Sequence, residues 1–241
     1  MKIPTITGVI DRRILVNYRV DPQVLVRILP APFEPKLQNG YGMAGVCLIR
    51  LKHIRPRFFP TFVGIHSENA AHRIAVRWQE HGTWREGVYV PRRDTSSPLN
   101  TLFGGRIFPG VHHRSQFHVT EANNRYRVEL VSNDDATHLV VDGKLAENLP
   151  DTSIFDSLQA ASDFFEAGSL GYSTTRSPGQ FDGLELRSFS WKVVPLDITV
   201  IESNFFHNNP LFPQGSVAFD CALLMRDIQH EWHARPLLYA T

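Results

Sequence analysis

Short stretches in which apolar and polar residues alternate, many of them rich in β-branched side chains, recur along this 241-residue chain. A β-strand places successive side chains on opposite faces, so a period of two predicts strands that are half buried. Such strands are expected at residues 14–20, 73–78, 87–90, 116–119, 126–131, 137–141, 184–187, 191–194 and 197–202. So many strands at close spacing predict a mainly β protein, a barrel or a sandwich, and not a parallel α/β fold.

Two further patterns indicate how strands are buried and connected. Residues 42–51 form a nearly continuous apolar run, which is typical of a strand buried on both faces. Residues 73–78 and 87–90 are separated by a polar turn segment, a pattern that favours a hairpin.

Only three short helices are expected. The first covers residues 22–29, where Asp21 serves as N-cap and Pro22 occupies the first helical position. The second covers residues 100–106 and ends on glycines. The third covers residues 154–167, with Ser153 as N-cap and Gly168 as the stop. Since the chain shows no repeat and no linker, we expect a single domain over residues 1–241.

Charge and cysteine content exclude several classes of function. The formal net charge is +1, with 25 basic and 24 acidic residues, so the composition predicts no nucleic-acid partner and no binding to an anionic membrane. No apolar run approaches the roughly 20 residues that a membrane-spanning helix needs. Cys47 and Cys221 are the only cysteines, too few for a disulfide framework, and we expect a cytoplasmic protein.

Four segments resemble those of a known superfamily in both order and spacing. They are residues 18–22, 28–35, 67–70 and 105–114, and they resemble the acetoacetate decarboxylase-like superfamily. Later segments, residues 87–90, 168–173, 191–193 and 219–226, resemble its YqjF-like branch, a domain of unknown function. The resemblance implies a cone-shaped β-barrel with a central pocket, flanked by antiparallel sheet.

The segment at residues 105–114 departs from the decarboxylases at its chemically important point. His113 and Arg114 stand where those enzymes carry two adjacent lysines. A lysine of lowered pKa can attack a carbonyl to form an imine, whereas an imidazole forms no stable imine of that kind. No lysine occurs between Lys52 and Lys144, so we expect no primary amine in the pocket and no imine-forming decarboxylase.

The resemblance also implies which residues line the pocket. It assigns acid/base work to His113 and Glu68, and substrate binding to Arg19, Asn69, Arg106 and His112. Arg19 would hold a carboxylate through its two-pronged guanidinium.

Alternatives remain open for each of these assignments. Adjacent strand residues point to opposite faces, so only one of His112 and His113 should face the pocket, and that histidine could merely fill the wall. Arg19 and Glu68 could instead form an ion pair with no role in turnover.

The predicted ligand is a small oxo or hydroxy acid, with acid/base chemistry as the enzymatic hypothesis. The alternatives are a binding protein without catalysis and a structural oligomer with a filled barrel. No cofactor is expected, and the histidines, including His230 and His233, match no metal-ligand spacing. Cys47 lacks the local signature of a nucleophile. Residues 205–213, a loop with large apolar side chains, would close the pocket or contact another subunit, and a homo-oligomer is expected.

Overall fold

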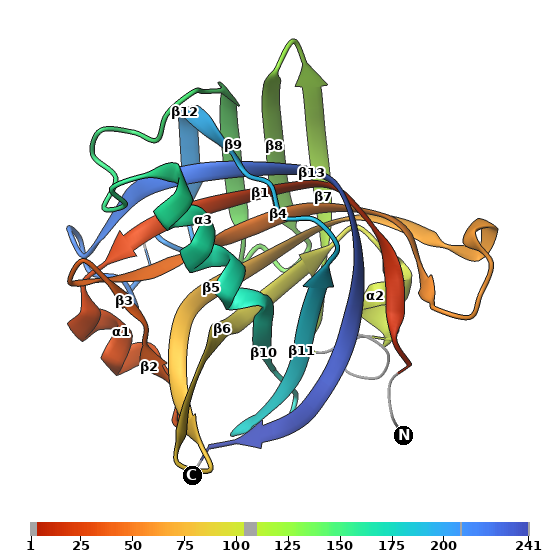
Figure 1. The fold of residues 1–241 in the computed structure, drawn as a ribbon, viewed down its shortest axis with the longest axis horizontal. Coiled ribbons are helices and arrows are strands. Elements are labelled where there is room, and N and C mark those ends of the chain that lie inside the picture. The colour runs from red at the N-terminus through yellow and green to blue at the C-terminus, as the bar shows by residue number, and fades with distance from the viewer. Residues whose placement is uncertain (1–3, 104–109, 208, 241) are drawn as a thin grey trace.

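A computed structural model describes residues 4–103, 110–207 and 209–240 (Figure 1). One thirteen-stranded sheet dominates it. The strands are β1 (Ile6–Val20), β2 (Glu34–Pro35), β3 (Leu37–Gln38), β4 (Tyr41–Pro56), β5 (Ile65–Glu80), β6 (Thr83–Thr95), β7 (His112–Ala122), β8 (Arg125–Ser132), β9 (His138–Leu145), β10 (Leu170–Thr174), β11 (Gln180–Ser188), β12 (Val194–Ser203) and β13 (Val217–Tyr239). The helices are α1 (Pro22–Ile28), α2 (Pro98–Phe103) and α3 (Leu158–Glu166), with 3-10 turns at Thr61–Val63 and Ala167–Ser169.

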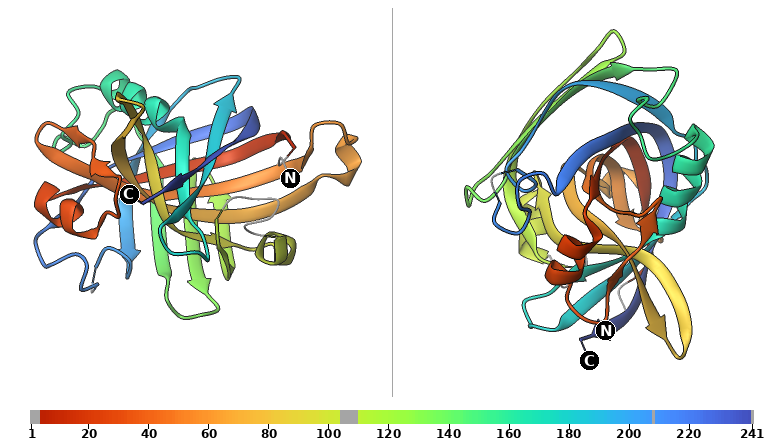
Figure 2. Two further views of the ribbon diagram at one scale, coloured as in Figure 1. Left: turned by 90° about the horizontal axis from the view of Figure 1, so that it is seen from below. Right: turned by 90° about the vertical axis from the view of Figure 1, so that its left-hand side faces the viewer.

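The sheet closes on itself in two rings that share strands. The first runs β5-β6-β7-β8-β9-β12-β13-β1-β4 and returns to β5, and the right-hand view of Figure 2 shows strands curving around it. The second leaves β6 through β10 and β11 and rejoins the sheet at β13. The strands shared by both rings are β13, β1, β4, β5 and β6. Most pairs are antiparallel, but β6 pairs in parallel with both β7 and β10, so the sheet is mixed. The mainly β prediction is confirmed, with a ring-like closure.

The shared strands are covered on both faces. On β1, Ile14, Val16 and Tyr18 pack in the larger apolar core with side chains of β8 and β9, whereas Leu15 packs in a second core beneath α3. The β4 segment predicted as a doubly buried strand at residues 42–51 alternates between these two cores in the same way. Burial on both faces is the physical reason for its continuous apolar run.

The helices agree with the sequence prediction only in part. Helix α1 begins at Pro22, and the Asp21 carboxylate accepts a hydrogen bond from the Gln23 amide, as predicted. Helix α3 begins at Leu158 and not at residue 154, because its N-cap is Ser157, whose hydroxyl accepts from the Ala160 amide.

Three further predictions, one N-cap, one helix and one strand, differ from the structure. Ser153, the expected N-cap, caps a turn instead: its hydroxyl donates to Asp220 and accepts from the Phe155 amide. The helix predicted at 100–106 is α2, which begins earlier, and residues 104–106 lie outside the described part. Of the strand predicted at 191–194, only Val194 is extended in β12.

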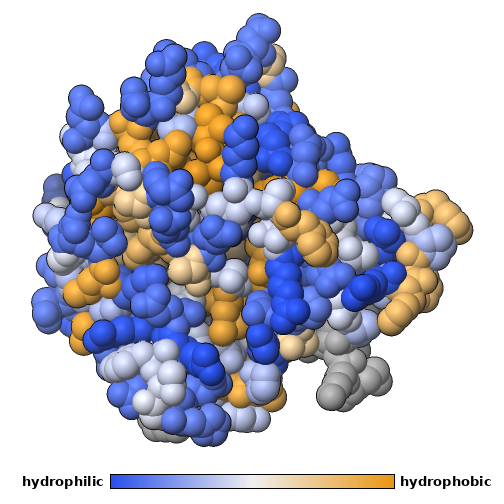
Figure 3. Space-filling view, in the orientation of Figure 1, coloured by the Kyte–Doolittle hydropathy of each residue, from blue (hydrophilic) through white to orange (hydrophobic). Residues whose placement is uncertain are grey.

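The turn between β4 and β5 projects from the body of the molecule. Phe58 and Phe62 at this turn are 91% and 87% exposed. The turn lies at the right of Figure 1, and apolar surface gathers at the same edge in Figure 3. Within the described ranges, no helix is long and apolar enough to cross a membrane.

Candidate functional site

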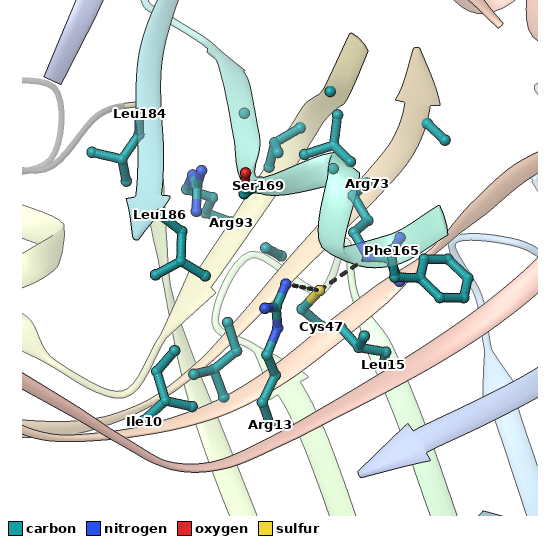
Figure 4. Close-up of a pocket in the computed structure, with 18 of the residues that line it drawn as sticks. Ile10, Arg13, Leu15, Cys47, Arg73, Arg93, Phe165, Ser169, Leu184 and Leu186 are labelled. Atoms are coloured by element: carbon teal, nitrogen blue, oxygen red, sulfur yellow. Dashed lines mark hydrogen bonds between the residues drawn. The ribbon is translucent and has the colours of Figure 1, made fainter. Parts of the chain in front are cut away.

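A cavity of about 110 Å³ lies within the second ring, between the shared strands and the β10–β11 flap (Figure 4). A single water needs only about 10–15 Å³ by this measure, so the cavity has room for a molecule of several heavy atoms. Helix α3 covers one side with Phe164 and Phe165. The walls are largely apolar, and their polar side chains include Arg13, Arg73 and Arg93.

The register of the shared strands brings Arg13, Cys47 and Arg73 together. Cys47 on β4 lies opposite Leu15 of β1 and Ala71 of β5. Arg13 and Arg73 are each two residues along from these partners on the same face, in diagonal positions that long side chains can reach. The Cys47 Sγ therefore accepts from Arg73 Nε at 3.0 Å and from Arg13 Nη2 at 3.8 Å. Figure 4 shows the sulfur between the two guanidinium groups.

Within the described ranges, none of the three cavity arginines forms a direct ion pair with an acid, although the more distant charge of Asp182 acts on Arg93. No Asp or Glu of the described ranges lies within ion-pair distance of Arg13, Arg73 or Arg93. Arg73 donates to the Asn17 side chain at 2.5 Å, and Arg93 to the Ser173 hydroxyl at 2.9 Å. Arg13 Nε and Nη1 are buried and have no hydrogen-bond partner among the residues that the structure describes. Burial lowers the pKa of Arg93 to about 10, so its guanidinium still carries its charge at neutral pH.

A smaller cavity of about 50 Å³ adjoins the first and shares Arg93, Ile49 and Trp232 with it. Asn69 and His112, both predicted to bind substrate, line this second space. The Asn69 amide donates to Ser67 and accepts from the Thr95 hydroxyl at 2.8 Å, so the sheet holds its orientation.

Of the two adjacent histidines, His112 faces the smaller cavity. It pairs with Arg93 across the parallel β6–β7 ladder, and its Nδ1 lies 3.2 Å from the Gly110 carbonyl oxygen. Since a carbonyl only accepts, Nδ1 carries the proton and Nε2 the lone pair in the neutral ring. Burial, assisted by the Arg93 charge, lowers the pKa of His112 to about 3, so this ring is neutral at pH 7. His113 points to the opposite face, where its Nδ1 lies 2.9 Å from Asp134.

Glu68 lies on the other face of the shared sheet from the cavity. It accepts from Arg12 at 2.6 Å and from Arg50 at 2.5 Å, and both arginines also contact Glu121 on β7. Its neighbour Asn69 faces the cavity instead, because consecutive strand residues alternate. Glu68 and His112 are thus not brought together.

Arg19 lies away from the cavity as well. Its Nη1 donates to the Thr152 carbonyl at 2.6 Å and contacts Asp220 at 3.5 Å. Because Glu68 is held by Arg12 and Arg50, the alternative of an Arg19–Glu68 ion pair is wrong. Arg106 lies outside the described residues. A catalytic role for Glu68 and His113 stays a prediction from the resemblance.

One lysine lines the cavity wall, so the expectation of a pocket without a primary amine is wrong. Lys36 Nζ lies 2.6 Å from the Glu86 carboxylate and 4.5 Å from the ring centre of Phe164. The Lys36 amine is thus held by a carboxylate and by the face of an aromatic ring.

The sequence of this chain matches the profile of a known protein family. The profile of DUF2071, described as an uncharacterized conserved protein, matches residues 9–214. The chain belongs to the DUF2071 family. None of the curated proteins compared with this DUF2071 chain matches it.

Solved structures share the fold of this DUF2071 protein. An acetoacetate decarboxylase from Legionella pneumophila aligns with a TM-score of 0.61 and 12% identity, covering 95% of this chain and 86% of its own. An acetoacetate decarboxylase-like enzyme from Sphingomonas wittichii RW1 aligns with a TM-score of 0.61 and 11% identity, covering 99% and 94%. The enduracididine biosynthesis enzyme MppR, complexed with pyruvate, gives 0.61 and 11%, covering 100% and 91%. The acetoacetate decarboxylase-like prediction is confirmed for the fold.

Sequence reasoning missed the polar residues that dominate the DUF2071 cavity. Arg13, Arg73, Arg93 and Cys47 come from four strands, and no short motif joins them. The only signal was alternation: Asn69 and Arg73 differ by an even number of residues, so a strand containing both puts them on one face. Within the described ranges, no group of three or more His, Cys, Asp or Glu side chains could hold a metal ion.

Proposed function

We propose that the cavity binds a small organic acid, an oxo or hydroxy acid, through Arg13, Arg73 and Arg93. The observation that carries this proposal is that no Asp or Glu of the described residues forms a direct ion pair with any of the three cavity arginines. Charged groups away from water are normally paired, because an uncompensated charge is costly to bury. A ligand anion would supply the missing partner.

The chemistry of the walls narrows the ligand class. A guanidinium binds a carboxylate through two parallel hydrogen bonds, and three of them favour an acid over a neutral molecule. Leu15, Leu184 and Leu186 would pack against a short carbon skeleton. His112 in the adjoining space would offer a neutral imidazole to a carbonyl or hydroxyl group.

Two observations favour binding without an imine and without acid/base turnover by Glu68 and His113. The ammonium group of Lys36 is paired with Glu86 and stacked on Phe164. Glu68 and His113 engage ion-pair partners away from the cavity. The pyruvate in the MppR structure is a small oxo acid in a protein of the same fold, which supports the ligand class.

Calorimetric titration tests the proposal with pyruvate, lactate and acetoacetate, and with pyruvamide as the neutral analogue. We expect the acids to bind and pyruvamide to bind at least tenfold more weakly, a difference of about 1.4 kcal/mol. Arg93→Gln should weaken acid binding by a similar factor. Arg85→Gln is the matched control, because Arg85 is exposed and pairs with Glu80.

Equal affinity for pyruvate and pyruvamide, or an Arg93→Gln protein that binds acids like the wild type, would contradict the proposal. When the protein is treated with these acids and borohydride, mass spectrometry should show no increase in the mass of the protein. A reduced adduct on Lys36 would instead show that the protein forms an imine with the acid.

A further inference from the structure

Cys47 belongs to the second apolar core and also lines the wall of the cavity. Its side chain is 3% exposed, lies on the cavity wall and contacts two guanidinium groups, neither of which forms an ion pair with an acid in the described part of the chain. The buried, unpartnered Nε and Nη1 of Arg13 lie on the same side chain that contacts the sulfur. Two cations around one sulfur stabilise the thiolate, which is the nucleophilic form of cysteine.

We propose that Cys47 captures the bound oxo acid covalently and reversibly, by addition of its sulfur to the keto carbon. This rests on the proposed function, because the arginines must first hold the carboxylate next to the sulfur. The step is a simple addition: a C–S bond forms and the π bond of the carbonyl breaks. The carbonyl oxygen takes up the proton that the thiol lost, so the product is a hemithioketal and no oxidant or leaving group is needed.

The two cysteines of the chain differ in the way this proposal requires. Burial raises the pKa of the Cys47 thiol, but the charges and hydrogen bonds of Arg73 and Arg13 outweigh it, so the net shift is downward. Burial and the neighbouring Asp220 raise the pKa of Cys221 well above its usual value. Cys221 is also buried but does not line the cavity. It is therefore an internal control for accessibility and for thiolate content.

Alkylation of the intact protein tests the reactivity of the thiol. With iodoacetamide at pH 6 to 8, followed by peptide mass spectrometry, we expect Cys47 to be modified at least tenfold faster than Cys221. Pyruvate should slow the modification of Cys47 because it occupies the same space. Modification of Cys47 only after denaturation would overturn the proposal.

Carbon-13 NMR with pyruvate labelled at its keto carbon tests the covalent step. We expect a protein-bound tetrahedral carbon resonance in the wild type and in Cys221→Ser, and its loss in Cys47→Ser. If pyruvate binds by calorimetry but this resonance is absent from the wild type, the covalent proposal is wrong and the binding function stands. If pyruvate and the other acids bind in no calorimetric experiment, the proposed function itself fails, and the covalent proposal with it.

Discussion

Arg12 and Arg13 are adjacent in sequence, but their side chains lie on opposite faces of β1. Arg13 reaches the cavity, whereas the fully buried Arg12 side chain donates to Glu68 at 2.6 Å and to Glu121 at 2.7 Å. Two carboxylates thus depend on one buried cation, together with Arg50. At the scale of single residues, one position along the strand separates a structural ion-pair network from a candidate ligand site.

Replacing Arg12 tests this network. Arg12→Met keeps most of the apolar stem but removes the charge, so Glu68 and Glu121 lose a partner at the buried end of the network. Breaking a buried pair from one side typically costs about 3–5 kcal/mol, and we expect a loss of that order in the free energy of unfolding. Urea denaturation measures it, with Arg85→Met as the exposed control, where a change below about 1 kcal/mol is expected. Equal losses in both variants would show that the network contributes no more than a surface pair.

At the scale of elements, the second ring depends on how closely β10 approaches β6. Gly87 on β6 faces Leu170 at the start of β10, and a Cβ added at Gly87 would lie 2.3 Å from the Leu170 carbonyl oxygen. No side chain fits there unless the backbone moves. Because Gly87 also lines the cavity, this contact couples the β10–β11 flap to the candidate site.

Gly87→Ala is therefore expected to lower the free energy of unfolding by about 1–3 kcal/mol, the usual cost of overpacking. It should also weaken acid binding, because displacement of β10 changes the cavity wall. Gly168→Ala is the matched control for stability at the same junction, since its added Cβ would lie 3.5 Å from Val88 Cγ1, an ordinary contact. Denaturation of both variants measures the loss of stability, and titration of Gly87→Ala with pyruvate measures the loss of binding. A Gly87→Ala protein as stable as Gly168→Ala would contradict the close approach.

At the scale of the whole molecule, three histidines with lowered pKa values make stability depend on pH. Burial is the main cause that lowers the pKa of His72 and His112 to about 3, and that of His230 to about 4. In the unfolded chain a histidine titrates near 6.5. Below pH 6.5 the unfolded state therefore binds protons that the folded state does not, so stability falls as the pH falls.

We expect the free energy of unfolding to drop between about pH 6.5 and pH 4, by up to about 1.4 kcal/mol per pH unit for each of these histidines. Denaturation curves across this range measure the slope. His72→Gln should reduce the slope by the equivalent of one proton, whereas His138→Gln, at an exposed position, should leave it unchanged. A slope in His72→Gln equal to that of the wild type would show that His72 is protonated in the folded protein.

The strand positions and the first helix could be predicted because their causes are local. Alternation marked β1, β5, β7 and β8, and the Asp21-Pro22 pair marked the start of α1, since a cap and its amide are neighbours in the chain. The start of α3 was misplaced because Ser153 and Ser157 are both good caps. The contact of Ser153 with the distant Asp220 decided between them. Oligomeric state and cytoplasmic location stay predictions.

The amino-acid sequence was enough to predict the mainly β class and the family resemblance; that His113 and Arg114 stand in place of the paired lysines stays a prediction from that resemblance. The folded structure was needed to show that His112 faces the smaller cavity, that Glu68 lies on the opposite face of the sheet, and that Lys36 reaches the wall of the larger cavity. It alone brought Arg13, Cys47 and Arg73 together. The reason is physical: alternation says which residues of one strand share a face, but the register between strands says which residues of different strands meet. That register depends on packing across the whole sheet.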